Sequence, residues 1–577
     1  MAVSQDNSPG PKAFPRRLWA RALDVADACV ALAVVALLVA RFATGWGAQA
    51  AGLLARLDVA LLAYFAASVA ARVWVMGGWL GWLRGRWFDL VIAVPLVELT
   101  VGGWTAPWYL VRQVAALVGA FARTKRAERL VSQLRLHPAR LMVGSFALAI
   151  AVGTVLLSLP MASTTGESLR VIDALFTSTS ATCVTGLIVL DTGTDFSLFG
   201  QLVILVLLQL GGLGIMTFSV ALVMAVGGTI SKSREVVMRD MLDQESVRDV
   251  LGLVRFILMV TFVVEAAGAL ALFFCFGPTR GYSTRTLYEA VFHSVSAFCN
   301  AGFSMFSTSL EAFRADVWVN GVMSALIIVG GLGFPVLRDL LMMGWGRRLG
   351  AGLSPRLRTQ TKVVLTTTVL LLVGGTAIFY VADGSDTLKG LSTGERLLTS
   401  WFQSVTARTA GFNTVGIGQV GHAGLLLIMV LMFVGASPGS TGGGVKTTTV
   451  AVVWHTMRAA FSGRRDVEVF QRTIPRTIVR RAVALVMLSV LVLVVTTIAL
   501  MVVEDQPFEW LLFEAVSAFG TVGLSAGATA SLTDAGRLIV TVLMFVGRLG
   551  PLTLALSLVG DVRPAAYKYP DSRLMVG

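Results

Sequence analysis

Long apolar runs alternate with short polar segments along the chain, a pattern that predicts a bundle of membrane-spanning helices. A helix needs about 20 mostly apolar residues to cross a bilayer. Before residue 136, four runs approach that length, and we expect spans at residues 24–43, 55–77, 87–103 and 107–123. The fourth run contains Arg112 and precedes a basic cluster, so we interpret it as a span with a basic cytoplasmic exit.

From residue 137 onward, one arrangement recurs four times. Each repeat consists of a span, a half-length apolar stretch, a short glycine-containing segment and a second span. The half-length stretches lie at residues 172–187, 287–303, 397–412 and 511–524. A glycine followed by Leu or Phe ends each stretch, at Gly186, Gly302, Gly411 and Gly523. A second glycine-rich mark follows each of them, at residues 211–214, 330–333, 435–444 and 547–550.

This repetition predicts an all-α polytopic membrane protein. We expect four M1–P–M2 repeats (span, pore helix, span) in pseudo-fourfold symmetry, preceded by about four extra transmembrane helices. The N-terminal membrane region is placed at residues 1–136. The repeats are placed at residues 137–230, 231–345, 346–460 and 461–577, the last of which includes the C-terminal tail.

Composition and charge fit a membrane protein better than a soluble one. Hydrophobic residues make up 55% of the 577 residues and charged residues 14%, against about a quarter in soluble proteins. The net charge of +14 could suggest nucleic-acid binding, but Lys and Arg gather in linkers near 229–256, 347–362 and 458–481. Basic loops mark the cytoplasmic side. We therefore expect a multi-pass protein of the cell membrane, with both termini cytoplasmic and no nucleic-acid partner.

The half-length stretches predict an ion path. A helix of that length cannot cross a bilayer, and its irregular continuation must be buried in protein or line a water-filled cavity. Glycine permits backbone angles that turn carbonyls toward a central axis, and rings of carbonyls replace the hydration shell of a cation. We expect K⁺ to be the substrate and the selectivity filter to consist of Thr182, Cys183, Val184, Thr185, Gly186, Cys299, Asn300, Ala301, Gly302, Arg408, Thr409, Ala410, Gly411, Gly520, Thr521, Val522 and Gly523.

Three of these residues, Cys183, Asn300 and Arg408, flank the filter glycines, and we expect them to brace the segments from behind. Arg408 would repel K⁺ if it faced the axis. We therefore expect it to point away or to pair, with Glu289 and Glu514 in the half-length stretches as candidate partners.

A second glycine-rich segment, at residues 435–449, interrupts the apolar stretch of the third repeat and predicts a movable gate. Three consecutive glycines exceed what a helix kink needs. The segment resembles the start of a phosphate-binding loop, but Val445 stands where that loop needs Lys. Arg548 is an intramembrane charge, which favours a functional role. The predicted gate consists of Ser437, Pro438, Gly439, Ser440, Thr441, Gly442, Gly443, Gly444, Lys446 and Arg548.

These segments resemble the Trk/Ktr/HKT superfamily of cation transporters, above all the Ktr-type potassium-translocating membrane subunit. The likeness rests on CVTGL, AFCNAGFS, TARTAGFNTVG and the GGLG-containing second spans, and it covers residues 137–577. The tail at 567–577 resembles the short C-terminal tails of that group. The resemblance implies one pore per chain, a homodimer, the four filter glycines, an intramembrane gating loop and a basic residue below the filter, matched by Arg548. A glycine at the first filter position, where sodium-favouring plant relatives have Ser, implies potassium.

The resemblance also implies a separate cytosolic ring of nucleotide-binding (RCK-type) regulatory subunits. We expect no cofactor in this chain, membrane lipid as its surroundings and Na⁺ as a candidate activator. Four scattered histidines and four cysteines without a CxxC pair predict no transition-metal site and no disulfide scaffold. No constellation of catalytic residues supports an enzyme.

Two other functions stay open. A Na⁺- or H⁺-coupled secondary transporter also uses broken helices, and Glu265 is the clear mid-span acid, although the repeats share one orientation. A voltage-responsive protein is the other, because residues 84–96 resemble the third helix of voltage-sensor-like domains. A sensor needs several Arg residues within the membrane field, and Arg112 is the only clear one.

Overall fold

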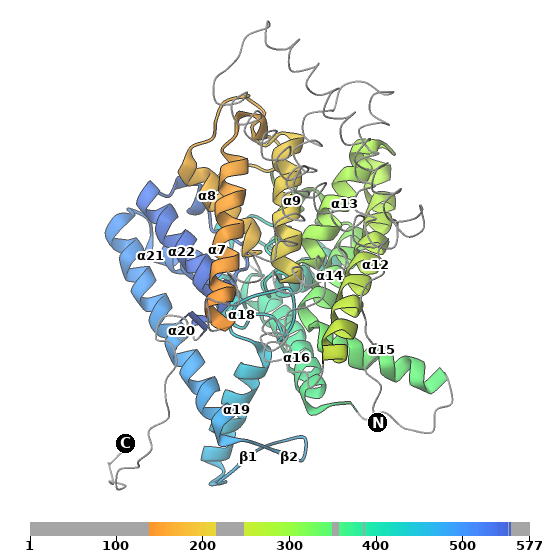
Figure 1. Ribbon diagram of the computed structural model, residues 1–577, viewed down its shortest axis with the longest axis vertical. Coiled ribbons are helices and arrows are strands. Elements are labelled where there is room, and N and C mark those ends of the chain that lie inside the picture. Colours follow the sequence, from red (N-terminus) through yellow and green to blue (C-terminus); the bar gives the residue numbers. More distant parts are fainter. Residues whose placement is uncertain (1–137, 215–246, 349–356, 385–386, 552, 555–577) are drawn as a thin grey trace, which may run out of the picture.

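The computed structural model describes residues 138–214, 247–348, 357–384, 387–551 and 553–554. The four spans predicted before residue 136 and the C-terminal tail lie outside these residues. The described part is built almost entirely of helices (Figure 1). Between them lie 3₁₀ turns at Pro160–Ala162, Glu311–Phe313, Ile417–Gln419 and Thr529–Ser531. One small antiparallel hairpin joins β1 (Val467–Val469) to β2 (Arg472–Ile474).

Four units follow one another, each with a long first helix, a short second helix and a third helix. The first unit comprises α7 (Pro138–Leu157), α8 (Val171–Thr182) and α9 (Leu198–Leu213). The second comprises α12 (Val247–Arg280), α13 (Thr284–Phe298), α14 (Val317–Leu332) and α15 (Phe334–Arg348). The third comprises α16 (Thr359–Ala382), α17 (Thr393–Thr406), α18 (His422–Phe433) and α19 (Thr447–Phe461). The fourth comprises α20 (Arg476–Val503), α21 (Phe508–Gly520) and α22 (Asp534–Leu549).

Three of the four first helices can cross a bilayer unbroken in the part of the chain that the structure describes. Residues 252–280 of α12, together with α16 and α20, are long and apolar enough. Only 22% of the apolar window of α20 is buried, as expected for a helix that faces lipid. The short helices have 12 to 15 residues and reach at most about 22 Å, less than the hydrocarbon thickness. They therefore end inside the membrane.

Polar caps fix where many of these helices begin. The side chains of Ser197, Ser283, Asp316, Ser392 and Thr533 each accept a hydrogen bond from a backbone amide in the first turn that follows. At the start of α17, the third residue of the helix, Glu395, bonds back to the Ser392 amide to complete a capping box. Among the short helices, these local signals mark the starts of α13 and α17, whereas α8 and α21 begin without a side-chain cap.

The second span of the second unit is bent, whereas the sequence predicted an interruption only in the third repeat. Helices α9, α14 and α22 each end at a glycine with positive φ, namely Gly214 (77°), Gly333 (91°) and Gly550 (82°). Beyond Gly333 the chain turns by 101° into α15. The final glycine of each GGLG or GRLG mark combines a positive φ with an extended ψ, a backbone conformation that glycine adopts readily and that ends the helix.

Packing between units runs in a ring. The third helix of each unit packs against the short helix of the next, α9 on α13, α14 on α17 and α18 on α21. Helix α22 of the last unit packs on α8 of the first and closes the ring. Two arginine–aspartate pairs cross this closing junction: Arg170–Asp534 at 2.5 Å and Arg537–Asp173. Both join residues 364 positions apart.

We predict that the more buried pair, Asp173–Arg537, stabilises the closing junction more than the exposed pair, Arg170–Asp534. The side chains of Asp173 and Arg537 are 10% and 13% exposed, whereas those of Arg170 and Asp534 are 59% and 57% exposed. Asp173→Asn should lower the free energy of unfolding by about 3 kcal/mol, because it leaves a partly buried guanidinium without its counter-ion. Asp534→Asn should cost less than about 1 kcal/mol. Thermal unfolding of the purified full chain in detergent measures both, and equal shifts would contradict the assignment.

Candidate cation pathway

The irregular segments after the four short helices meet at the centre of the ring. We call residues 183–186, 299–302, 408–411 and 520–523 the central segments. Each ends in a glycine with positive φ, at 92° for Gly186, 71° for Gly302, 78° for Gly411 and 97° for Gly523. Two residues earlier, a non-glycine residue also has positive φ, at Val184, Asn300, Thr409 and Thr521. The same alternation therefore occurs four times, although the residues differ.

The four glycines touch one another's backbones in cyclic order. A Cβ placed on Gly302 would lie 2.8 Å from the carbonyl oxygen of Ala410, and one on Gly186 would lie 2.5 Å from that of Ala301. Cβ atoms on Gly411 and Gly523 would collide with the carbonyl oxygens of the residues that precede the next glycines, Val522 and Thr185. Each unit therefore presents a carbonyl to the glycine of the preceding unit. A side chain at any of the four positions would force the neighbouring backbone to shift.

A hydroxyl in each short helix holds the neighbouring central segment. The Ser180 hydroxyl donates to the Leu187 carbonyl at 2.7 Å, and the Ser296 hydroxyl donates to Phe303 at 2.7 Å. In the third unit, Thr406 donates to Phe412 at 2.6 Å. In the fourth, the Ser517 hydroxyl accepts from the Gly523 amide at 3.2 Å.

These hydroxyls are not among the residues predicted from the sequence. The signal that could have found them is a Phe four residues earlier in every repeat, Phe-x-x-x-Ser/Thr-Ala. The four phenylalanines, Phe176, Phe292, Phe402 and Phe513, are fully buried. The third repeat has one residue fewer between hydroxyl and glycine, so that Arg408 stands where the first two repeats have cysteine.

Polar contacts also fasten the second central segment to its neighbours. The side chains of Asn300 and Thr409 lie 3.1 Å apart and connect the second and third units. Cys299 lies with its Sγ 3.6 Å from Oε1 of Gln209 on α9. Gln209 in turn donates to both carboxylate oxygens of Glu265 on α12, at 3.0 and 3.2 Å. Glu265 thus takes part in a buried contact between units rather than standing alone in its span.

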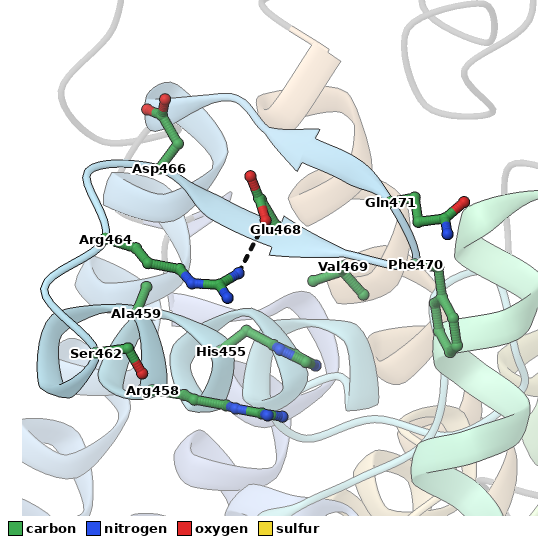
Figure 2. Close-up of a pocket in the computed structure, with 10 residues that line it drawn as sticks. All are labelled: His455, Arg458, Ala459, Ser462, Arg464, Asp466, Glu468, Val469, Phe470 and Gln471. Atoms are coloured by element: carbon green, nitrogen blue, oxygen red, sulfur yellow. Dashed lines mark hydrogen bonds and ion pairs between the residues drawn. The ribbon is translucent and has the colours of Figure 1, made fainter.

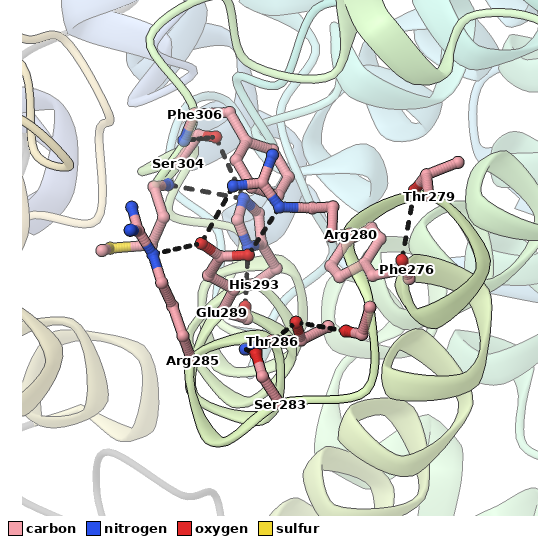
Figure 3. Close-up of polar contacts among 12 residues, drawn as sticks. Phe276, Thr279, Arg280, Ser283, Arg285, Thr286, Glu289, His293, Ser304 and Phe306 are labelled. Carbon is pink, nitrogen blue, oxygen red and sulfur yellow. Dashed lines mark hydrogen bonds and ion pairs between the residues drawn. The ribbon is translucent and has the colours of Figure 1, made fainter.

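Arg408 does not pair with either of the predicted carboxylates. Glu289 accepts from Arg280 at 2.9 and 3.2 Å and from Arg285 at 3.2 Å (Figure 3). Glu514 accepts from two hydroxyls of its own unit, those of Ser525 and Thr529. Both acids are held by residues close to them in sequence, which is why the expectation was wrong. Nε of Arg408 is buried without a hydrogen-bond partner among the described residues.

The Glu289 cluster supports the exit of the second central segment. Figure 3 shows the His293 ring between Glu289 and Ser304. Its two nitrogens lie 2.7 Å from the Glu289 carbonyl and 3.0 Å from the Ser304 hydroxyl. The His293 ring stacks on the Phe306 ring, with their centroids 4.5 Å apart. The Arg280 guanidinium lies over the same Phe306 ring, 4.7 Å from its centroid. Three side chains thereby fix the chain just after Gly302.

The α18–α19 loop (residues 434–446) lies directly against the central segments. The Thr441 hydroxyl donates to the Phe298 carbonyl at the end of α13, at 3.1 Å. The Gly443 amide donates to the Thr521 hydroxyl at 3.1 Å. A Cβ on Gly442 would collide with the Thr409 hydroxyl. The loop therefore touches the second, third and fourth units at the residues that bound their central segments.

Backbone hydrogen bonds tie the same loop to the end of α14. The Ser437 amide donates to Gly331 at 3.1 Å, and the Thr441 amide donates to Gly330 at 3.3 Å. In the opposite direction, the Phe334 amide donates to the Gly439 carbonyl at 2.9 Å. The break at Gly333 thus exposes amide and carbonyl groups that the loop satisfies.

Two cationic side chains donate hydrogen bonds to carbonyls of the loop, one from α22 and one from the loop itself. Arg548 of α22 donates to the Thr441 carbonyl in the loop and to the Gly211 carbonyl at the end of α9. Lys446 donates to Gly442 at 2.7 Å, within the loop itself. Among the described residues, no group of three or more His, Cys, Asp or Glu side chains could hold a metal ion.

Comparison with known proteins shows the family to which this chain belongs. Residues 114–561 match the family model described as "TrkH: Cation transport protein". The chain belongs to the TrkH family of cation transport proteins. It is 40% identical to the potassium/sodium uptake protein NtpJ of Enterococcus hirae, over 77% of this chain and 98% of that protein. It is 38% identical to the Ktr system potassium uptake protein B of Bacillus subtilis, over 79% of this chain and all of that protein.

A solved structure shows the same fold. The potassium transporter TrkH from Vibrio parahaemolyticus is 19% identical, with a TM-score of 0.59 over 83% of this chain and 97% of that one. The resemblance to this superfamily and the all-α polytopic membrane fold are thereby confirmed, and the chain is a transport protein rather than an enzyme. The family match begins 23 residues before residue 137 and ends at 561, short of the tail at 567–577.

We predict that the central glycines of this TrkH family member tolerate no side chain. Gly523→Ala should lower the free energy of unfolding by at least about 2 kcal/mol, because the positive φ is strained for alanine and its Cβ meets the Thr185 carbonyl. The matched control is Gly374→Ala in α16, where nothing lies within 4 Å, and this change should be neutral or stabilising. Thermal unfolding tests both variants without reference to transport. Equal melting temperatures would show that the central backbone is not closed.

Proposed function

We propose that the protein takes up potassium across the cell membrane through a selectivity filter formed by the central segments. The observation that carries the proposal is the closed cycle of four glycines, each against a carbonyl of the next unit. Carbonyl rings select dehydrated cations. The short helices α8, α13, α17 and α21 end at these segments, and their carboxyl ends carry partial negative charge that favours a cation. The names of the relatives, potassium and potassium/sodium uptake proteins, support K⁺ as the substrate.

The α18–α19 loop is the proposed gate. It lies against the third and fourth central segments and the end of α13, and it is held by Arg548, so passage needs the loop to move away from Thr409 and Thr521. We further propose that a separate cytosolic nucleotide-binding ring controls this movement and that the chain forms a homodimer with cytoplasmic termini. Na⁺ is a proposed activator. The names of the Ktr relatives describe them as parts of a system, which supports a separate partner.

The first test is growth of a potassium-uptake-deficient bacterial strain at limiting K⁺. The full chain, alone or with a candidate cytosolic partner, should restore growth, and Gly411→Asp should abolish the rescue because a carboxylate would collide with the Val522 backbone. Membrane insertion of both proteins is checked by immunoblot. Equal rescue by the Gly411 variant would reject the filter. No rescue by inserted wild type would favour sodium transport, which ²²Na⁺ flux would measure.

Selectivity provides a finer test. Gly302 has the roomiest of the four contacts, and Gly302→Ser should lower the K⁺/Na⁺ flux ratio by at least about tenfold, equivalent to about 1.4 kcal/mol. Liposome flux with ⁸⁶Rb⁺ and ²²Na⁺ measures the ratio. Gly394→Ser at the start of α17, where nothing lies within 4 Å, is the control. An unchanged ratio in a folded Gly302 variant would place the filter elsewhere.

Release of the gate should raise flux. Arg548→Gln removes charge-assisted donors to Thr441 and Gly211 and should shift the closed-to-open equilibrium by about tenfold or more. Shortening residues 439–444 should act in the same direction. Arg481→Gln, on the exposed side of α20, controls for loss of charge. Unaltered flux both in Arg548→Gln and in the variant with the shortened loop would contradict the gate.

A Na⁺- or H⁺-coupled carrier remains the second candidate, because Glu265 is a buried carboxylate bonded to Gln209. Coupling predicts K⁺ accumulation driven by an imposed Na⁺ or H⁺ gradient at zero membrane potential. Loss of such accumulation in Glu265→Gln, with downhill K⁺ flux retained, would support the carrier.

A further inference from the structure

A cavity of about 340 Å³ lies between α19 and the β1–β2 hairpin, away from the central segments. Figure 2 shows the helix on one side and the hairpin on the other. In Figure 1 the hairpin lies at the end of the molecule opposite α8 and α13. One stripe of α19 faces the cavity, formed by His455, Arg458 and Ser462.

Both acidic side chains of the cavity have a partner, whereas one of its basic side chains has none among the described residues. Its two acids are already paired, Glu468 with Arg464 at 3.0 Å and Asp466 with Arg476 at 3.6 Å. The Arg458 side chain makes no hydrogen bond or ion pair with the described residues, whereas its backbone carbonyl accepts a bond from the Ser462 amide. The cavity thus offers an uncompensated guanidinium beside an imidazole and a hydroxyl, a donor set suited to a phosphate group.

The neighbouring stripe of the same helix is apolar and exposed. Trp454 is 64% exposed, Met457 48% and Phe461 87%. These residues are spaced like the cavity stripe and lie one position before each of its members. In a helix of a transport protein, exposed aromatic and apolar side chains beside a basic stripe are typical of the membrane interface, where acyl chains and headgroups meet.

We propose that this cavity binds the phosphate headgroup of an anionic phospholipid, with Arg458 as the principal contact and the acyl chains along Trp454, Met457 and Phe461. Guanidinium groups near a membrane surface attract acidic headgroups. A soluble phosphate would satisfy Arg458 equally well but would leave the apolar stripe unused. The lipid therefore accounts for both stripes of the helix.

A bound headgroup would restrict the movement of the α18–α19 loop through α19. Helix α19 begins at Thr447, directly after Lys446, and its first hydroxyl lies 3.1 Å from the Ser437 hydroxyl of the loop. A lipid held near the far end of this 15-residue helix restrains the element to which the loop is attached. This second step rests on the proposed gate, whereas lipid binding does not.

Binding is tested on the purified full chain in detergent by native mass spectrometry and by the shift in melting temperature. Titrated phosphatidylglycerol should bind and stabilise wild type, and phosphatidylcholine of the same chain length should not. Arg458→Gln should bind phosphatidylglycerol about tenfold more weakly, at the low end of what a charge-assisted hydrogen bond contributes. Arg465→Gln removes the same charge from an exposed residue that does not line the cavity and should bind as wild type.

Two outcomes would overturn the proposal. Equal weakening in the Arg458 and Arg465 variants would show diffuse electrostatic attraction. Displacement of phosphatidylglycerol by equimolar inorganic phosphate or ATP would show a site for a soluble anion. In liposomes, phosphatidylglycerol should change ⁸⁶Rb⁺ flux of wild type but not of Arg458→Gln. Lipid binding without any flux would leave the site standing and reject the proposed transport function instead.

Discussion

The constraint on which the structure depends is that irregular backbone inside a membrane must find its hydrogen-bond partners within the protein. Four short helices end halfway across and release the chain into such backbone. The protein satisfies it with one hydroxyl per repeat, Ser180, Ser296, Thr406 or Ser517, and with the backbone of the next unit. Close approach of the four backbones then excludes every side chain from the central glycines.

The ring has one junction that chain connectivity does not support. Successive units are covalently joined, but the first and fourth meet only through space. Two arginine–aspartate pairs between α8 and α22 lie at this junction. Arg548, further along α22, reaches the end of α9 in the first unit and the α18–α19 loop in the third. The closing helix therefore connects the outer ring to the loop below its centre.

Symmetry is broken in the third and second units, and both departures concern the same loop. The third unit opens its last span into residues 434–446, and the second bends by 101° at Gly333. The bend frees the Gly330 and Gly331 carbonyls and the Phe334 amide, and the loop bonds to all three. The proposed gate would need partners that it can leave, and hydrogen bonds to backbone groups exposed at a helix break are of that kind.

The sequence by itself determined the membrane environment, the four repeats, the half-length helices and the glycines that end them. These features follow from local apolar length and from the backbone freedom of glycine, which neighbouring residues alone express. Only the tertiary structure decided the cyclic contacts of the glycines, the ion pair between Arg280 of α12 and Glu289 of α13, and the bonds of Arg548. Those contacts join residues of different helices and often of different repeats, so no local pattern specifies them. The second GGLG segment combines both kinds of information. Its glycines are visible in the sequence, whereas the 101° turn at Gly333 goes together with hydrogen bonds to a loop of another unit, which no local pattern specifies.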